Sequence, residues 1–196
     1  MTGAGWGMGE AAGASEIVEE AVRSISRYWS RRGPATTLAQ ALIQYAGAKD
    51  LEDLLEGLVL GRYRIQADAA PLVFQVAAQG DAVAGKIIEW AGRELGGLAA
   101  GVIRQLHFED RSFEVVMVGS LFNGGPMLVE PMRQEILAAA SGAQMVRLAA
   151  PPVIGAVLLG MEAAGVMPAP KVRENLVKTA TGPIASDALP FREMGS

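Results

Sequence analysis

The residues best suited to chemistry lie in one stretch, 115–125, where an apolar run ends in a glycine turn. The β-branched run VVMV is followed by Gly119 and Ser120, then by Asn123 and two further glycines, and a helix-like segment begins near Pro126. Glycine after a buried strand lets a ligand approach the backbone closely. Open α/β sheets bind ligands at loops of this kind. The stretch therefore predicts a nucleotide- or phosphate-binding edge.

The rest of the chain offers few groups for catalysis. It has no cysteine, which excludes disulfides, thiolate metal sites and thiol nucleophiles. His107 is the only histidine, so a cluster of histidine ligands is excluded as well. The pair Glu109-Asp110 is typical of a solvated loop before the strand. We recognise no catalytic base, metal-binding acid pair or phosphate-binding P-loop, and we expect neither catalytic residues nor metal ligands in this chain.

Composition narrows the class of protein. Of the 196 residues, 51% are hydrophobic and 19% charged, which is typical of an ordinary globular chain. The net charge is −4, and Arg31-Arg32 is the only adjacent basic pair, which argues against nucleic-acid binding. No apolar run approaches the roughly 18 residues of a membrane span, and no signal peptide is recognisable at the amino end. We expect a cytoplasmic protein that binds neither nucleic acid nor membrane.

The hydrophobic periodicity predicts a helix-rich α/β chain. Strands are expected over 115–118 and 145–148, and the strand–helix–strand–helix order implies a parallel pair with a right-handed crossover. Parallel sheets usually carry more strands and are covered on both faces, so the chain resembles part of a larger sheet. Helices are expected over 15–30, 37–45, 51–60, 67–79, 81–106, 126–141 and 153–164.

The segment 81–106 has the longest continuous helical period and is lined with small residues. Glycine lowers helix propensity, so close packing against a sheet or a partner is the expected compensation. The small residues are Ala84, Gly85, Ala91, Gly92, Gly96, Gly97, Ala100 and Gly101.

Four motifs in order carry a resemblance to a known family. They are GWG followed by GE, AAQGD before the small-residue helix, VVMVGSLF, and APPVIGAVLLGMEAAG. Together they resemble the carboxyl-terminal lobe of N-acetylglucosamine kinase-like proteins and BadF/BadG/BcrA/BcrD-type ATPases, within the actin/hexokinase/Hsp70 superfamily. The resemblance covers about residues 3–165. It implies a ribonuclease H-like, actin-like ATPase lobe that is helix-rich, has a short parallel strand pair and lacks its first strands.

The same resemblance implies a domain organisation and a nucleotide site. Residues 1–14 would be a remnant of the sugar-side motif, 15–168 the lobe, and 169–196 a loosely ordered tail. Gly119 and Ser120 match the adenosine-side turn, and Asn123 matches a position near the adenine pocket. Gly80 matches a nucleotide-side glycine, although the residues alone favour a simple helix stop there. The implied cofactors are ATP and Mg²⁺.

A sugar-side region is implied near the amino end. Gly5-Trp6-Gly7 and Glu10 match family positions that contact sugar hydroxyls, and a carboxylate is well suited to accept hydrogen bonds from hydroxyls. The match departs from the family pattern in its spacing, in glutamate for aspartate, and in the sequence of residues 11–13. Trp6 filling a surface groove is the alternative.

Three hypotheses follow for the function. The first is the ATP-binding lobe of an N-acetylhexosamine kinase or BadF-type ATPase, which transfers phosphate to an amino sugar when an amino-terminal lobe completes it. In the family, the catalytic aspartate and the phosphate-binding turns lie on the amino-terminal side of the region matched here. The second is a degenerate, non-catalytic binding or regulatory module. The third is a homodimeric structural protein joined through helix 81–106.

Overall fold

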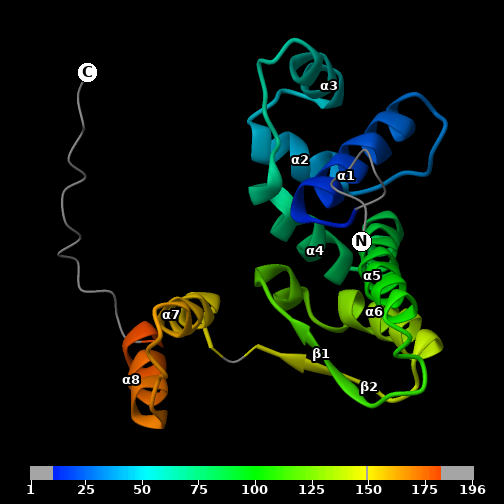
Figure 1. Ribbon diagram of the computed structural model, residues 1–196. Coiled ribbons are helices and arrows are strands. Elements are labelled where there is room, and N and C mark those ends of the chain that lie inside the picture. The colour runs from blue at the N-terminus through cyan, green and yellow to red at the C-terminus, as the bar shows by residue number, and fades with distance from the viewer. Residues whose placement is uncertain (1–10, 149, 182–196) are drawn as a thin grey trace, which may run out of the picture. The chain divides into compact units, whose positions relative to one another are not determined.

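A computed structural model of the protein describes residues 11–148 and 150–181 (Figure 1). The chain divides into two compact units between Val146 and Arg147. The predicted lobe over 15–168 spans this division, and its bounds stay a prediction. Its predicted last helix packs with the helix that follows it, within the second unit.

The first unit opens with a group of helices around one core. In chain order these are α1 (Ala14–Trp29), α2 (Leu38–Ala46), α3 (Leu51–Val59), the short 3-10 helix η2 (Ala67–Ala69), α4 (Ala70–Ala78) and the long α5 (Ala82–Gln105). The α-helices turn apolar side chains inward at the three- and four-residue spacing of an amphipathic helix. The largest fully buried side chains of this core are Ile17, Ile25, Leu38, Leu42, Leu54, Val73, Ile88 and Leu128.

A small sheet follows, with one helix between its strands. Strand β1 (Phe113–Met117) leads through the 3-10 turn η3 (Ser120–Gly124) into α6 (Pro126–Ala139), and the chain returns as β2 (Ala143–Arg147) beside β1. The two strands are parallel, as predicted. Alternate residues of β1 pack toward a second core around Ile103, Met132 and Ile136. The helix-rich α/β class is thus confirmed, and β1 begins two residues earlier than the sequence predicted.

The glycines of α5 let it lie directly against α6 (Figure 1). A Cβ atom on Gly96 would come within 2.7 Å of the Met132 carbonyl oxygen, and one on Gly92 would collide with the backbone of Leu128. The close packing expected of this helix is therefore present. Its partner is a helix of the same unit rather than the sheet.

The described residues of the second unit form two helices, α7 (Pro152–Ala163) and α8 (Pro170–Thr181), which contact each other. A turn through Gly165, whose φ is +76°, ends α7. Helix α8 occupies residues that the sequence assigned to a loosely ordered tail. Its formation has a local reason, since proline suits the first helical position and the following Lys, Arg, Glu and Leu residues are good helix formers.

Within the described part of the chain, no helix is both long enough and apolar enough to cross a membrane. The 24-residue α5 has the length. Its charged side chains, including Lys86, Glu89, Arg93 and Glu94, break the apolar character that a span needs.

Candidate functional site: the pocket at the carboxyl end of β1

The turn that follows β1 depends on two glycines with unusual backbone angles. Gly119 has φ +117° and ψ 162°, and Gly125 has φ +75° and ψ −156°. A Cβ atom on either would meet nothing within 4 Å, so the restriction comes from the backbone conformation rather than from crowding. The two glycines direct the chain sharply out of the strand, through η3 and into α6.

A pocket of about 520 Å³ lies between this turn and the amino-terminal part of α4. This volume is within the range of small-molecule sites. Ser120 and Asn123, two of the residues predicted for nucleotide binding, line it, and Gly119 forms the bend just before them. The remaining lining residues are Ala14, Ala67, Asp68, Ala70, Pro71, Phe74, Gln75, Leu121 and Gly124.

Phe74 fixes the distance between α4 and the turn. Its ring lies so close to Gly124 that a Cβ atom there would overlap it. The side chain is half-buried and packs on the main core. Gly124 is therefore required by close approach, and the ring of Phe74 forms an apolar wall of the pocket.

Asp68 is the one carboxylate among the residues that line the pocket. Its Oδ2 accepts a hydrogen bond of 2.6 Å from the hydroxyl of Tyr45 on α2. The hydrogen bond to Asp68 is the main reason that the pKa of Tyr45 lies above its usual value, and burial adds to it. The contact ties η2 to α2 and holds this wall of the pocket in place.

Gly80 lies elsewhere. It follows α4 with φ +94°, whereas the pocket is lined by the beginning of that helix, so Gly80 is not among the lining residues. The structure thus places Ser120 and Asn123 together and Gly80 apart from them. The nucleotide role of Gly80 stays a prediction.

The neighbouring Asp81 has a structural task as the amino-terminal cap of α5. Its Oδ1 accepts the backbone N–H groups of Val83 and Ala84 at 2.9 Å each, and its Oδ2 accepts the backbone N–H of Thr37 at 2.7 Å. The hydroxyl of the buried Thr36 donates to the same carboxylate at 3.0 Å. Burial alone would raise the pKa of Asp81, but these hydrogen bonds outweigh it and the pKa is lowered.

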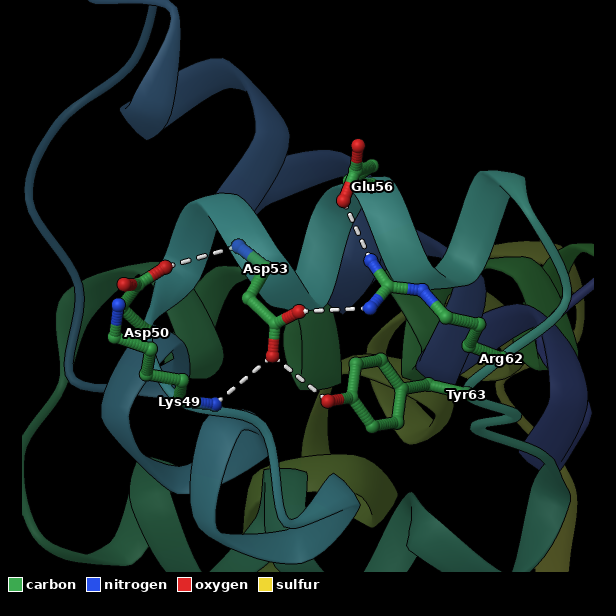
Figure 2. Close-up of polar contacts among 6 residues, drawn as sticks. All are labelled: Lys49, Asp50, Asp53, Glu56, Arg62 and Tyr63. Atoms are coloured by element: carbon green, nitrogen blue, oxygen red, sulfur yellow. Dashed lines mark hydrogen bonds and ion pairs between the residues drawn. The ribbon is translucent and has the colours of Figure 1, made fainter.

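A second carboxylate with many partners lies on α3 (Figure 2). Asp53 accepts hydrogen bonds from the backbone N–H of Lys49 at 3.0 Å, the Tyr63 hydroxyl at 2.7 Å and Arg62 at 3.1 Å. Chiefly the Lys49 hydrogen bond, and then that of Tyr63, lower the pKa of Asp53. Since these donors close the loop after α3 onto the start of that helix, the cluster stabilises the fold.

The predicted sugar-side residues Gly5, Trp6, Gly7 and Glu10 lie outside the described residues, and their roles stay predictions. Within the described ranges, no three side chains of His, Asp or Glu are grouped so that they could hold a metal ion. The structure therefore assigns no Mg²⁺ ligand to this part of the chain.

Sequence reasoning missed Phe74 and Gln75 as pocket residues. Both fit the helical spacing of 67–79, which marks them only as parts of an amphipathic helix. Their place beside the turn depends on a contact between segments almost fifty positions apart, and no local pattern encodes that contact.

The chain matches no protein-family model, and no curated protein matches its sequence. The interpretation of the pocket therefore rests on its geometry and on the order of the motifs. Ser120 and Asn123 were predicted from the motifs, and both also line the pocket.

Proposed function

We propose that this chain is the ATP-binding lobe of an N-acetylhexosamine kinase, of the N-acetylglucosamine kinase-like type, or of a BadF-type ATPase, with a ribonuclease H-like fold. Completed by an amino-terminal lobe, it would transfer phosphate from ATP to a sugar hydroxyl. The observation that carries the proposal is the pocket at the carboxyl end of β1, where a glycine turn faces the start of α4.

The lining of the pocket suits a nucleoside. Phe74 and Leu121 provide apolar surface for a base, and Gln75, Ser120 and Asn123 provide hydrogen-bond donors and acceptors. A mostly apolar pocket with a few placed polar groups is the usual form of a small-molecule site. We assign the adenosine part of ATP to this pocket.

Catalysis is assigned to the completing lobe. Phosphoryl transfer depends on positioning and on Mg²⁺-assisted charge stabilisation, and Mg²⁺ is usually bound through one or two carboxylates together with substrate phosphates. The only pocket carboxylate, Asp68, is engaged by Tyr45. In the proposal this chain binds and orients the nucleotide, while Gly5, Trp6, Gly7 and Glu10 contribute to an amino-sugar site.

A non-catalytic binding module or a homodimer is the second candidate, and one observation favours it. In the second unit, Val153 is 57% exposed, Leu159 67% and Met167 83%. Large apolar side chains that are this exposed are suited to pack against another protein surface. The completing lobe or a second copy of the chain would cover them. The mass of the protein in solution separates these two partners, because a strict monomer contradicts the homodimer.

Thermal unfolding with and without ATP and Mg²⁺ tests the proposed function. A ligand that binds only the native state at about 100 times its Kd adds about 2.7 kcal/mol, which raises Tm by roughly 5 °C or more in a chain of this size. Tripolyphosphate, which lacks the nucleoside, should leave Tm unchanged. An unchanged Tm at millimolar ATP would contradict the proposal.

One helix supplies a matched pair of variants for the same experiment. Gln75 lines the pocket, whereas Gln79 lies one turn further along and caps the far end of α4. We expect Gln75→Ala to reduce the ATP-induced shift and Gln79→Ala to leave it intact. Equal effects of the two substitutions would place the nucleotide elsewhere.

A further inference from the structure

A second cleft lies in the first unit, between α1 and the amino-terminal half of α5, and shares no lining residue with the pocket at β1. Its volume is about 530 Å³, close to that of the first. The turn at Gly33-Pro34 closes one side. Three cations line it, Arg23 and Arg27 from α1 and Lys86 from α5, together with the carboxylate of Glu20.

The two arginines are held by acids of their own helix. Glu20 accepts from Arg27 at 2.9 Å and from Arg23 at 3.3 Å, and Arg23 also lies 3.5 Å from Glu19. These ion pairs fix the guanidinium groups along the rim. Because each arginine has more donors than a single carboxylate uses, each retains donors for an incoming anion.

Lys86 differs from the arginines. It lies opposite them on α5, and within the described ranges its ammonium group makes no ion pair. The chain as a whole is acidic, with a net charge of −4. Because Glu19 and Glu20 balance the two arginines, Lys86 leaves the cleft with one net positive charge.

The floor of the cleft is apolar and comes from the same face of α5 as Lys86. Val83, Lys86 and Trp90 follow at intervals of three and four residues, which places them in one row on a helix. Val83 and Trp90 are half-buried, and Ile87 beside them is 3% exposed. Lys86 and Trp90 thus line the same side of the cleft.

We propose that this cleft binds a small organic anion. Its carboxylate or phosphate group pairs with Lys86 and the free donors of the arginines, and its ring-sized apolar body lies on Trp90 and Ile87. The site is separate from the proposed nucleotide pocket and holds whether or not that pocket binds ATP.

Fluorescence of Trp90 provides the test. In a full chain carrying Trp6→Phe and Trp29→Phe, Trp90 is the only tryptophan. The probe is 8-anilinonaphthalene-1-sulfonate, whose sulfonate stands in for a phosphate and whose rings supply the apolar body. Binding should quench Trp90 and transfer its energy to the probe. The uncharged N-phenyl-1-naphthylamine should produce this signal at least about tenfold more weakly, as expected when one charged hydrogen bond is lost.

Charge reversal separates this cleft from the rest of the surface. Lys86→Glu should raise the Kd of the probe by about tenfold or more, and Lys86→Gln should have a smaller effect in the same direction. Lys49→Glu, on the exposed loop before α3, is the matched control and should change nothing. Benzoate and phenyl phosphate, used as competitors, distinguish a carboxylate ligand from a phosphate ligand.

Three results would overturn the inference. They are the absence of Trp90 quenching, equal effects of the substitutions at Lys86 and Lys49, and equal affinity for the neutral probe. If the double tryptophan variant does not fold, the substitutions at Lys86 and Lys49 are made in the chain with all three tryptophans. The emission of the probe then measures its Kd for each variant.

Discussion

Alanine substitutions at two adjacent glycines of α5 test how the first unit is packed. A Cβ atom on Gly96 would come within 2.6 Å of the Glu135 Cβ and 2.7 Å of the Met132 carbonyl oxygen. A Cβ atom on Gly97 would meet nothing within 4 Å. The two positions share helix and sequence context and differ in whether α6 lies against them.

The expected changes have opposite signs. Glycine to alanine in a helix interior gains about 1 kcal/mol of propensity, so Gly97→Ala should stabilise the protein by roughly that amount. At Gly96 the same gain is opposed by overpacking against backbone atoms of α6, which costs about 3 kcal/mol. Gly96→Ala should therefore lower the free energy of unfolding by about 2 kcal/mol.

Urea unfolding followed by circular dichroism measures both variants, and an unchanged m-value shows that the two-state comparison is valid. Gly92→Ala should behave like Gly96→Ala, because Gly92 also lies against α6. Gly85→Ala should behave like Gly97→Ala, because Gly85 also faces open space. If Gly96→Ala stabilised the protein as much as Gly97→Ala, the packing of α5 on α6 described above would be refuted.

Three further predictions concern the carboxylates that hold helix ends. Asp81→Ala should lower the free energy of unfolding by about 2–4 kcal/mol, because a cap worth about 1 kcal/mol is lost and buried donors lose their acceptor. Asp50→Ala removes an exposed cap with one backbone hydrogen bond and should cost only about 1 kcal/mol. Equal losses in denaturant unfolding would contradict this difference. Since the folded pKa values of Asp81 and Asp53 are lowered, their contribution to stability is complete above their unfolded pKa and is lost as pH falls through the folded values. Unfolding free energies measured from pH 7 downward should therefore decline below about pH 4, and a flat profile would contradict the sign. Tyr63→Phe removes one donor from Asp53, so the pKa of Asp53, followed by carboxyl carbon NMR, should move up toward its ordinary value.

The sequence predicted the helices up to α7, the strand pair and the turn well, because each depends on local periodicity or on glycine and proline, but it did not predict α8. Helix α5 was expected over 81–106 and is observed over Ala82–Gln105, since Asp81 is a strong cap. Strand β1 was placed two residues late. Phe113 packs into the second core through Phe108, with ring centroids 5.5 Å apart, and that contact lies outside the apolar run that the sequence displays.

The candidate site was only partly predictable. Ser120 and Asn123 could be named because the glycine turn marks the end of a strand. Phe74 and Lys86 could not, because each belongs to an ordinary amphipathic helix and gains its role from a distant segment, η3 for Phe74 and α1 for Lys86. Small residues on α5 indicated close packing, but their spacing did not identify α6 as the partner.

Amide chemical shifts recorded during titration with ATP and Mg²⁺ test the central claim most directly. If the pocket at the carboxyl end of β1 binds the nucleoside, the perturbed amides should cluster in residues 119–125 and 67–75. Shifts at residues 83–90 would report binding in the other cleft and do not count toward this pocket. Perturbations confined to that second cleft, or none at millimolar ATP, would contradict the proposed nucleotide-binding lobe.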